Sequence, residues 1–103
     1  MRARRIAAVA AAVAGLAAGG AAKGAPTAVV RCHVHADFNI LISSARNMTC
    51  RSAAAEMRRY RGSISRRFTT PGRFRCYQVS GNRLAGQWRC VRGTRAFRFE
   101  FSD

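Results

Sequence analysis

The sequence predicts an exported α+β domain, with one amphipathic helix packed on a small, mainly antiparallel sheet and two disulfides as staples. Three observations predict it: an apolar N-terminal segment, four cysteines that all follow this segment, and one helical pattern among stretches that alternate like strands. With 103 residues, the chain has room for one small domain at most. Because such a domain buries only about 60% of its unfolded surface, we expect covalent links to contribute much of its stability.

Residues 1–22 have the three parts of a secretory signal peptide. The MRARR start is basic, Ile6–Ala18 is apolar, and Gly19–Ala22 offers a cleavage site of the A-x-A type. The apolar stretch falls short of the roughly 20 strongly apolar residues that span a bilayer, so we expect cleavage near Ala22 and no transmembrane segment in the mature chain. The predicted division is a signal peptide over 1–22, a flexible leader over 23–29 and a domain over 30–103.

The mature part of the chain is strongly basic. It carries Lys23 and fifteen arginines, sixteen basic residues against four acidic ones, for a net charge of +12. Arginine outnumbers lysine 18 to 1 in the whole chain, and together with the abundant alanine this is typical of a GC-rich genome. Codon bias explains arginine in place of lysine, but it does not explain why so few acids accompany the arginines.

The first strand pattern begins after the leader, at residue 30. One face carries Val30, Cys32 and Val34, and the other carries Arg31, His33 and His35. Ala36 and Asp37 fit a tight turn. Phe38–Ser43 is more continuously apolar, which predicts a second and more central strand.

The segment Cys50–Gly62 has the clearest helical pattern in the chain. Its less polar residues recur at i, i+3, i+4, i+7 and i+10, starting from Cys50. Either Asn47 or Thr49 can cap the first turn, because a short side-chain oxygen there accepts from the unpaired amides. Gly62 can take the left-handed conformation that ends a helix.

Three strand-like segments follow a basic link over Ser63–Arg73, in which Pro71 and Gly72 signal a turn. The segments are Phe74–Ser80, Gln87–Val91 and Ala96–Phe101, with a loop over Gly81–Gly86. If the first two pair around Arg83, Cys76 stands opposite Cys90. The face expected to meet the helix carries Phe74, Cys76, Trp88 and Cys90, continued by Phe97, Phe99 and Phe101. The reverse face carries Arg75, Tyr77, Arg89, Arg98 and Glu100.

The cysteines Cys32, Cys50, Cys76 and Cys90 predict two disulfides, because their gaps of 18, 26 and 14 fit no zinc-finger pattern. A helix of about twelve residues is roughly 18 Å long. The link that follows can span roughly 36 Å, so the next strand can start beside either end of the helix. We favour Cys50 bridged to Cys76 or Cys90, and Cys32 bridged to the other. Direct pairing of Cys76 with Cys90 is the alternative.

The order of these motifs resembles a group of small secreted four-cysteine proteins of GC-rich actinobacteria. The resemblance rests on the early Cys32, the NMTC helix start, the aromatic-x-Cys strand, the WRCVRG strand and the FRFEF ending. It covers Cys32–Phe101, nearly all of the mature chain. The resemblance implies an exported, disulfide-stapled α+β domain, and it offers no catalytic residue to carry over.

Two patterns suggest chemistry that we do not favour. His33, His35 and Asp37 recur at every second position and could ligate zinc or copper, but we interpret them as an exposed strand face that runs into a turn. His35, Glu56 or Glu100 beside arginines could serve a nuclease, but no spacing forces any pair together. No G-x-S-x-G motif is present either. We therefore expect no metal, no cofactor and no enzymatic activity.

Arginines gather around two aromatic residues in the stretch Met57–Phe68. Guanidinium groups hold phosphate or carboxylate through paired hydrogen bonds, and aromatic rings stack on bases or sugars. The alternative is a solvated helix end and loop whose charge keeps the protein soluble. The predicted polyanion site comprises Arg58, Arg59, Arg61, Arg66, Arg67 and Arg73, with Arg75, Arg89 and Arg98 from the strands.

Together these features predict a monomeric, non-catalytic module outside the cytoplasm. Its expected partner is an anionic cell-wall polymer, a nucleic acid or an anionic membrane surface at the cell envelope. Two alternatives remain open. The protein could be a secreted cationic effector that disrupts membranes or cleaves nucleic acid, or an inhibitor that presents the Ser63–Arg73 loop to another protein.

Overall fold

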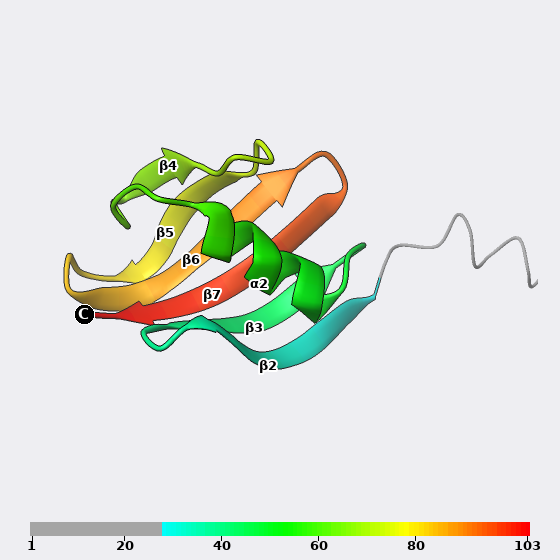
Figure 1. The fold of residues 1–103 in the computed structure, drawn as a ribbon, viewed down its shortest axis with the longest axis horizontal. Helices are drawn as coiled ribbons and strands as arrows, with labels where there is room; N and C mark the ends of the chain where they lie inside the picture. Colours follow the sequence, from blue (N-terminus) through cyan, green and yellow to red (C-terminus); the bar gives the residue numbers. More distant parts are fainter. Residues whose placement is uncertain (1–27) are drawn as a thin grey trace, which may run out of the picture.

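The computed structural model describes residues 28–103, which form one antiparallel sheet with a helix across one face (Figure 1). The strands are β2 (Val29–Asp37), β3 (Ile40–Arg46), β4 (Arg67–Thr69), β5 (Arg75–Gly81), β6 (Ala85–Arg92) and β7 (Arg95–Ser102), and the helix is α2 (Cys50–Arg59). The order across the sheet is β2-β3-β7-β6-β5-β4. The predicted α+β class is confirmed, although the sheet dominates. The predicted signal peptide over 1–22 and the leader up to residue 27 lie outside the described residues.

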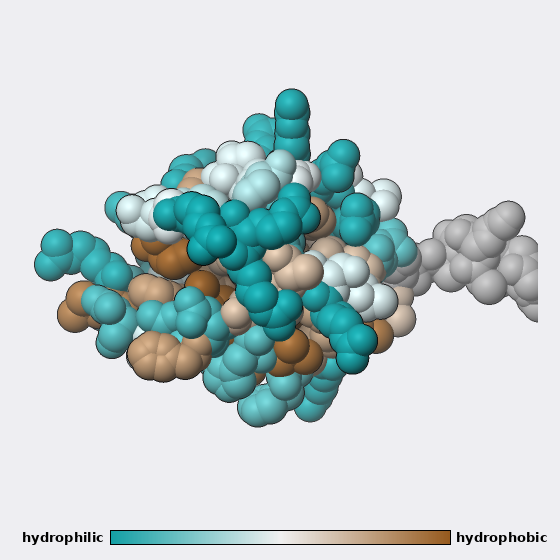
Figure 2. All heavy atoms as spheres, in the orientation of Figure 1, coloured by the Kyte–Doolittle hydropathy of each residue, from teal (hydrophilic) through white to brown (hydrophobic). Residues whose placement is uncertain are grey.

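The core lies between α2 and the sheet. Trp88, Phe97 and Phe99 are its largest fully buried side chains. The Trp88 and Phe99 rings stack with centroids 5.5 Å apart, and the Phe74 and Phe97 rings meet at 5.2 Å. From the helix, Ala53, Ala54 and Met57 are buried. Figure 2 views this side of the molecule, where hydrophilic residues gather over α2 and apolar residues show beside it.

The three aromatic-rich strands were predicted close to their observed bounds. They are β5, β6 and β7, and β5 pairs with β6 in the predicted register, with Cys76 opposite Cys90. The loop between them is shorter than predicted. The Asn82 side chain holds it, because its Oδ1 accepts from the amides of Leu84 and Ala85 at 2.8 and 3.1 Å. The predicted inner face of these strands is buried in the same hydrophobic core as the apolar residues of the helix.

Both ends of the helix are fixed by specific side chains. Of the two candidate caps, Thr49 is the one used, since its Oγ1 accepts from the Ser52 amide at 3.0 Å. The helix ends at Arg59, and Tyr60 is already extended, with φ −79° and ψ 125°. The Tyr60 ring stacks on Phe68 at 4.5 Å, and burial raises its hydroxyl pKa above the ordinary value.

The prediction that a left-handed Gly62 ends the helix is wrong. Among residues 28–103, the glycines with positive φ are Gly81 and Gly93. The Tyr60 hydroxyl donates to the Ser63 carbonyl at 2.6 Å. This side-chain hydrogen bond, and not a left-handed glycine, holds the chain where it leaves the helix.

The turn predicted at Ala36 and Asp37 lies further along the chain. β2 continues through Asp37, and the turn falls on Phe38 and Asn39. The Asp37 carboxylate accepts from the Phe38 amide at 2.7 Å, which caps the turn. Phe38 therefore does not begin a buried strand as expected, and its side chain is 85% exposed.

Strand β4 was not predicted. It lies inside the segment assigned to a basic link, and three residues are too short to show a strand period. It pairs with Arg75–Tyr77 of β5 across the predicted turn. The turn closes through Thr70, whose carbonyl accepts from Arg73 at 2.8 Å and whose amide donates to Phe74 at 2.9 Å.

The disulfides join Cys32 to Cys50 and Cys76 to Cys90, so the favoured pairing of Cys50 with a cysteine of β5 or β6 is wrong. The reason is the order of the strands. The helix packs against β2 and β3, which brings Cys50 beside Cys32. Strands β7 and β6 separate β3 from β5, so Cys76 pairs instead with its cross-strand neighbour Cys90, as in the alternative.

Glu56 is a buried carboxylate that ties α2 to the Pro71–Gly72 turn. Its Oε2 accepts from the Gly72 amide, and its Oε1 lies 3.3 Å from Arg59 Nη1. A Cβ atom on Gly72 would lie 2.6 Å from Glu56 Oε2, so a side chain at this position would have to displace the carboxylate. The acid therefore helps to position β4 and the start of β5.

We expect Glu56→Ala to lower the free energy of unfolding by about 2 kcal/mol, because the Gly72 amide loses a charged acceptor in a partly buried place. Urea denaturation followed by Trp88 fluorescence measures the change. Glu100→Ala removes an exposed acid and serves as the control, with an expected change within about 0.5 kcal/mol. Equal losses in the two variants would contradict the role given to Glu56.

Candidate functional site

The face of the sheet opposite α2 is open in the part of the chain that the structure describes. Residues paired directly across antiparallel strands point to the same face, so the strand register defines rows that cross the sheet. The central row reads Arg31, Ser44, Arg98, Arg89, Tyr77 and Arg67, from β2 to β4. The row beside it reads Val29, Arg46, Ala96, Val91, Arg75 and Thr69.

Each of the six strands places one arginine in these two rows. The set is called the arginine face below and consists of Arg31, Arg46, Arg67, Arg75, Arg89 and Arg98. Strand alternation is the physical reason: the neighbours of these arginines along the chain, such as Cys90 and Phe97, turn toward the helix and are buried. Because the apolar side chains fill the core on the helix side of the sheet, the arginines that alternate with them lie on the open face.

Two shallow hollows lie over the arginine face, and all of its arginines except Arg31 line one or both of them. One has a volume of about 590 Å³ and lies over β3, β7, β6 and β5, and the other, of about 630 Å³, lies over β4, β5 and β6. Tyr77 and Arg89 line both hollows, so the two form one continuous surface. Arg89 Nη1 donates to Tyr77 Oη at 3.1 Å, which orients the guanidinium beside the ring. Apolar Val29 and Val91 also line these hollows, Val29 in the first and Val91 in the second.

The arginine face has few acids near it. Within residues 28–103, the one ion pair joins Glu56 to Arg59, on the helix side. Glu100 lies on the open face, but in a third row with His35 and Leu41. Asp37 ends β2, and Asp103 donates its amide to Leu84 at the same end of the sheet. The charge of the open face therefore changes along the strands, from the arginine rows to a row that carries Glu100.

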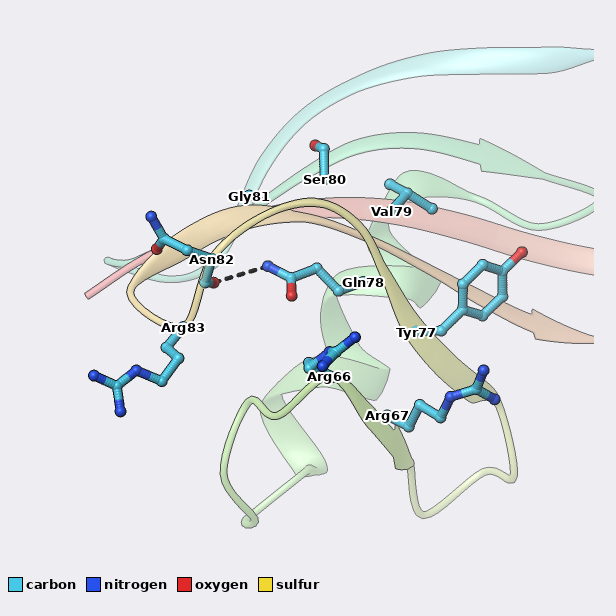
Figure 3. Close-up of a pocket in the computed structure, with 9 residues that line it drawn as sticks. All are labelled: Arg66, Arg67, Tyr77, Gln78, Val79, Ser80, Gly81, Asn82 and Arg83. Atoms are coloured by element: carbon cyan, nitrogen blue, oxygen red, sulfur yellow. Dashed lines mark hydrogen bonds between the residues drawn. The ribbon is translucent and has the colours of Figure 1, made fainter.

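The structure brings together part of the predicted polyanion site. Arg67, Arg75, Arg89 and Arg98 are on the arginine face, and Arg73 lines the hollow beside Arg75. Arg66 lines a third hollow, of about 490 Å³, at the edge of β5 with Arg83 and Gln78 (Figure 3). In that view Arg67 lies beside Tyr77, and Gln78 Nε2 donates to the Asn82 carbonyl at 2.8 Å.

Three of the predicted site residues lie elsewhere. Arg58, Arg59 and Arg61 lie at the end of α2, on the other side of the sheet. Arg58 Nη2 donates to the His35 carbonyl at 3.4 Å, and Arg59 pairs with Glu56. The local cluster in Met57–Phe68 is thus divided between the two sides of the molecule.

Sequence reasoning missed Arg31 and Arg46 as site residues. Both come from strands that precede the helix, and strand order across the sheet is what brings them beside the later strands. The alternation of Arg31 with Val30 and Cys32 was the available signal. It indicated an outward side chain without indicating its neighbours.

The histidine pattern does not form a cluster with Asp37. His35 pairs with Leu41, whereas Asp37 pairs with Ile40, so a bulge between them moves Asp37 off the face that carries His35. The His33 and His35 rings lie 6.1 Å apart. Among residues 28–103, no group of three or more histidine, cysteine or acidic side chains is placed to hold a metal ion.

Comparison with protein-family models, with curated proteins and with solved structures found no match to this chain. Over residues 28–103, no helix reaches the length and apolarity needed to cross a bilayer. The case for a function therefore depends on the geometry of the sheet.

Proposed function

We propose that this protein is an exported, non-catalytic module that binds anionic polymers through the arginine face. The observation that carries the proposal is one arginine from each strand on a face that no helix covers in the described residues. Guanidinium groups hold phosphate, sulfate or carboxylate groups through paired hydrogen bonds, and each has five donors to offer. A repeated anion can engage several of them at once.

The pairing of like charges supports a binding role over a merely solvated face. Arg89 stands directly opposite Arg98 in the sheet. Like charges in this position destabilise a sheet, so a face that served stability alone would place an acid or a neutral residue there. A bound anionic ligand offsets the repulsion between the two guanidinium groups. Their closeness then favours binding, because both can contact the same anion.

The disulfides support export. Disulfides persist in oxidising surroundings outside the cytoplasm, and both cysteine pairs are joined here. The predicted signal peptide and the resemblance to small secreted four-cysteine proteins of actinobacteria carry the same implication. We place the protein at the cell envelope or outside the cell, where wall polymers, nucleic acids and anionic lipid surfaces are the available polyanions.

The inhibitor alternative receives less support. The Ser63–Arg73 segment is held against the fold, since Trp88 Nε1 donates to the Ser65 carbonyl at 2.9 Å and Glu56 binds the Gly72 amide. The effector alternative shares the charge of the arginine face, and leakage of anionic vesicles or degradation of RNA by the pure protein would favour it.

We expect the double variant Arg89→Gln, Arg98→Gln to elute from heparin at clearly lower salt than the unmodified protein, because two central charges of the site are lost. The control is Arg51→Gln, Arg61→Gln, which removes the same charge from exposed positions of the helix and the segment after it. We expect the control to elute close to the unmodified protein. Equal shifts in the two variants would show that net charge alone causes retention.

A further inference from the structure

We propose that the hollow over β4, β5 and β6 is the strongest anion site of the arginine face, and that its ligand is a condensed phosphate, in which phosphate groups are joined through shared oxygens. This inference rests on the proposed function and deepens it, because it names one part of the face and one class of anion. Three features of the hollow support it: its uncompensated charge, the backbone of Arg73 and the donors that line it.

The hollow holds more positive charge than its neighbour. Five arginines line it, whereas three line the other hollow over the arginine face, which has a similar volume. None of the residues that line it is acidic, and the one ion pair within residues 28–103 joins Glu56 to Arg59. The charge of the five guanidinium groups is therefore left for a ligand to neutralise. The five are Arg67, Arg73, Arg75, Arg89 and Arg92, and the space that they line is called the five-arginine hollow below.

The fold concentrates these arginines in a small area. Arg67 and Arg89 lie on either side of Tyr77 in one row, two strand spacings apart, or about 10 Å. Arg75 lies in the adjacent row, about 7 Å away along the strands. A compact ligand that lies between these side chains therefore contacts guanidinium groups from β4, β5 and β6 at once.

The backbone of Arg73 is an independent sign that this hollow is a site. Its φ is 72°, in the left-handed region that glycine and asparagine adopt more readily than arginine. The turn holds it there, because the Arg73 amide donates to the Thr70 carbonyl at 2.8 Å. The preceding Gly72 amide donates to the buried Glu56 carboxylate. Residues that their surroundings keep in an unfavourable backbone conformation are concentrated at functional sites. A glycine would suit the turn better, whereas the arginine adds a charge to the hollow.

The side chains that line the hollow offer donors and almost no acceptors. Each guanidinium group has five N–H donors and no acceptor. The Tyr77 hydroxyl already accepts from Arg89 at 3.1 Å, and the other lining residues, Val91 and Gly93, have no polar side chain. The donors of a nucleotide base or a sugar would find no free side-chain acceptor here. A ligand made of acceptors alone, such as a chain of phosphate groups, matches these side chains.

The density of charge favours condensed phosphate over sulfate or carboxylate. In a sulfated or carboxylated polysaccharide a sugar ring separates successive charges, and in a nucleic acid a nucleoside does so. In a condensed phosphate, one shared oxygen separates them. A terminal phosphate group also carries a charge of about −1.5 to −2 at pH 7, whereas a carboxylate or a sulfate ester carries a single charge. Within a hollow of about 630 Å³, a condensed phosphate therefore comes closest to neutralising five guanidinium groups.

Isothermal titration calorimetry of the oxidised protein with inorganic tripolyphosphate tests the location of the site. Arg75→Gln removes one arginine of the five-arginine hollow, and Arg46→Gln removes one from the other hollow of the same face. We expect Arg75→Gln to weaken binding about tenfold, because a charged hydrogen-bond donor to the ligand is lost. Arg46→Gln is the matched control, and we expect it to weaken binding less than about twofold, because it acts only through screened charge. Equal losses in the two variants would overturn the proposal.

Arg73→Gly separates a binding role from a structural one. Glycine adopts the left-handed conformation without steric cost, and the variant also removes one of five like charges. We therefore expect the melting temperature without ligand to rise by about 4 °C, while tripolyphosphate binds about tenfold more weakly. Thermal unfolding followed by circular dichroism measures the first effect, and calorimetry measures the second. Unchanged affinity in this variant would overturn the proposal.

Competition between anions tests the choice of condensed phosphate. At equal pH and ionic strength, the unmodified protein should bind tripolyphosphate more tightly than citrate or a sulfated heparin disaccharide. Adenosine triphosphate should bind no more tightly than tripolyphosphate, because the hollow has no acceptors for the base. Tighter binding of any of these three competitors would overturn the proposal.

The heparin experiment distinguishes failure of this proposal from failure of the proposed function. If tripolyphosphate does not bind while retention on heparin still depends on Arg89 and Arg98, the assignment of condensed phosphate is wrong and the proposed function stands. If the unmodified protein binds neither heparin nor tripolyphosphate, the proposed function itself is wrong.

Discussion

Phe99→Ala is expected to lower the free energy of unfolding by about 3–5 kcal/mol, the usual cost of truncating a buried phenylalanine. Phe99 is fully buried in β7, stacks on Trp88 with centroids 5.5 Å apart, and lies 6.3 Å from the Phe68 ring. Within residues 28–103, β7 lies between β3 and β6 in the sheet, so the space left by the ring cannot close without moving paired strands. Small domains have total stabilities of about 5–15 kcal/mol, so the loss is a large part of the whole.

Urea denaturation followed by far-ultraviolet circular dichroism measures this loss. Phe38→Ala is the matched control, since the same substitution is made at a turn where the side chain is 85% exposed. We expect its stability to change by no more than about 0.5 kcal/mol. Similar losses in both variants would mean that the core does not lie between α2 and the sheet.

Removing the Cys32–Cys50 disulfide by Cys32→Ala, Cys50→Ala is expected to destabilise the protein by about 3 kcal/mol. The bridge closes a loop with a sequence separation of 18 and fastens the start of α2 to the edge strand β2. A ten-residue helix is marginal by itself in water, so the helix should lose protection first. Hydrogen exchange in α2 should therefore accelerate more than exchange in β6 and β7.

Peptide mapping of the unreduced protein checks the connectivity on which this result depends. A linked peptide pair containing Cys32 and Cys50, and a second containing Cys76 and Cys90, are expected. Recovery of Cys50 linked to either cysteine of the β5–β6 hairpin would contradict the order of the strands. Faster exchange in the sheet than in α2 after the double substitution would contradict the role of the bridge.

The sequence could predict the features that depend on near neighbours along the chain. Alternation alone placed Phe97 and Phe99 inside and Arg98 outside, because a strand turns successive side chains to opposite faces. The symmetry of the hairpin around Arg83 placed Cys76 opposite Cys90. The structure confirms this pairing, although a register shift between Gln78 and Ser80 displaces the pairs nearer the turn by one residue.

Features that depend on strand order could not be predicted in this way. The pairing of Cys50 requires knowing that β2 lies under the helix start and that β5 lies beyond β7 and β6. The same information brings Arg31 and Arg46 to the arginine face. Proximity in sequence was misleading for Arg58 and Arg61, since the chain passes from the helix side to the sheet edge between Tyr60 and Arg67.

The irregular outer strands have a consequence for assembly. β2 contains two register shifts, and β4 has three residues with Arg67 among them. Edge strands that are short, bulged or charged pair poorly with the edge strands of neighbouring molecules. Copies of this protein should therefore resist stacking into fibres even when crowded. When many copies bind one polyanion, we expect them to lie side by side along it. The length of the polyanion, and not contact between the copies, should then determine how many bind.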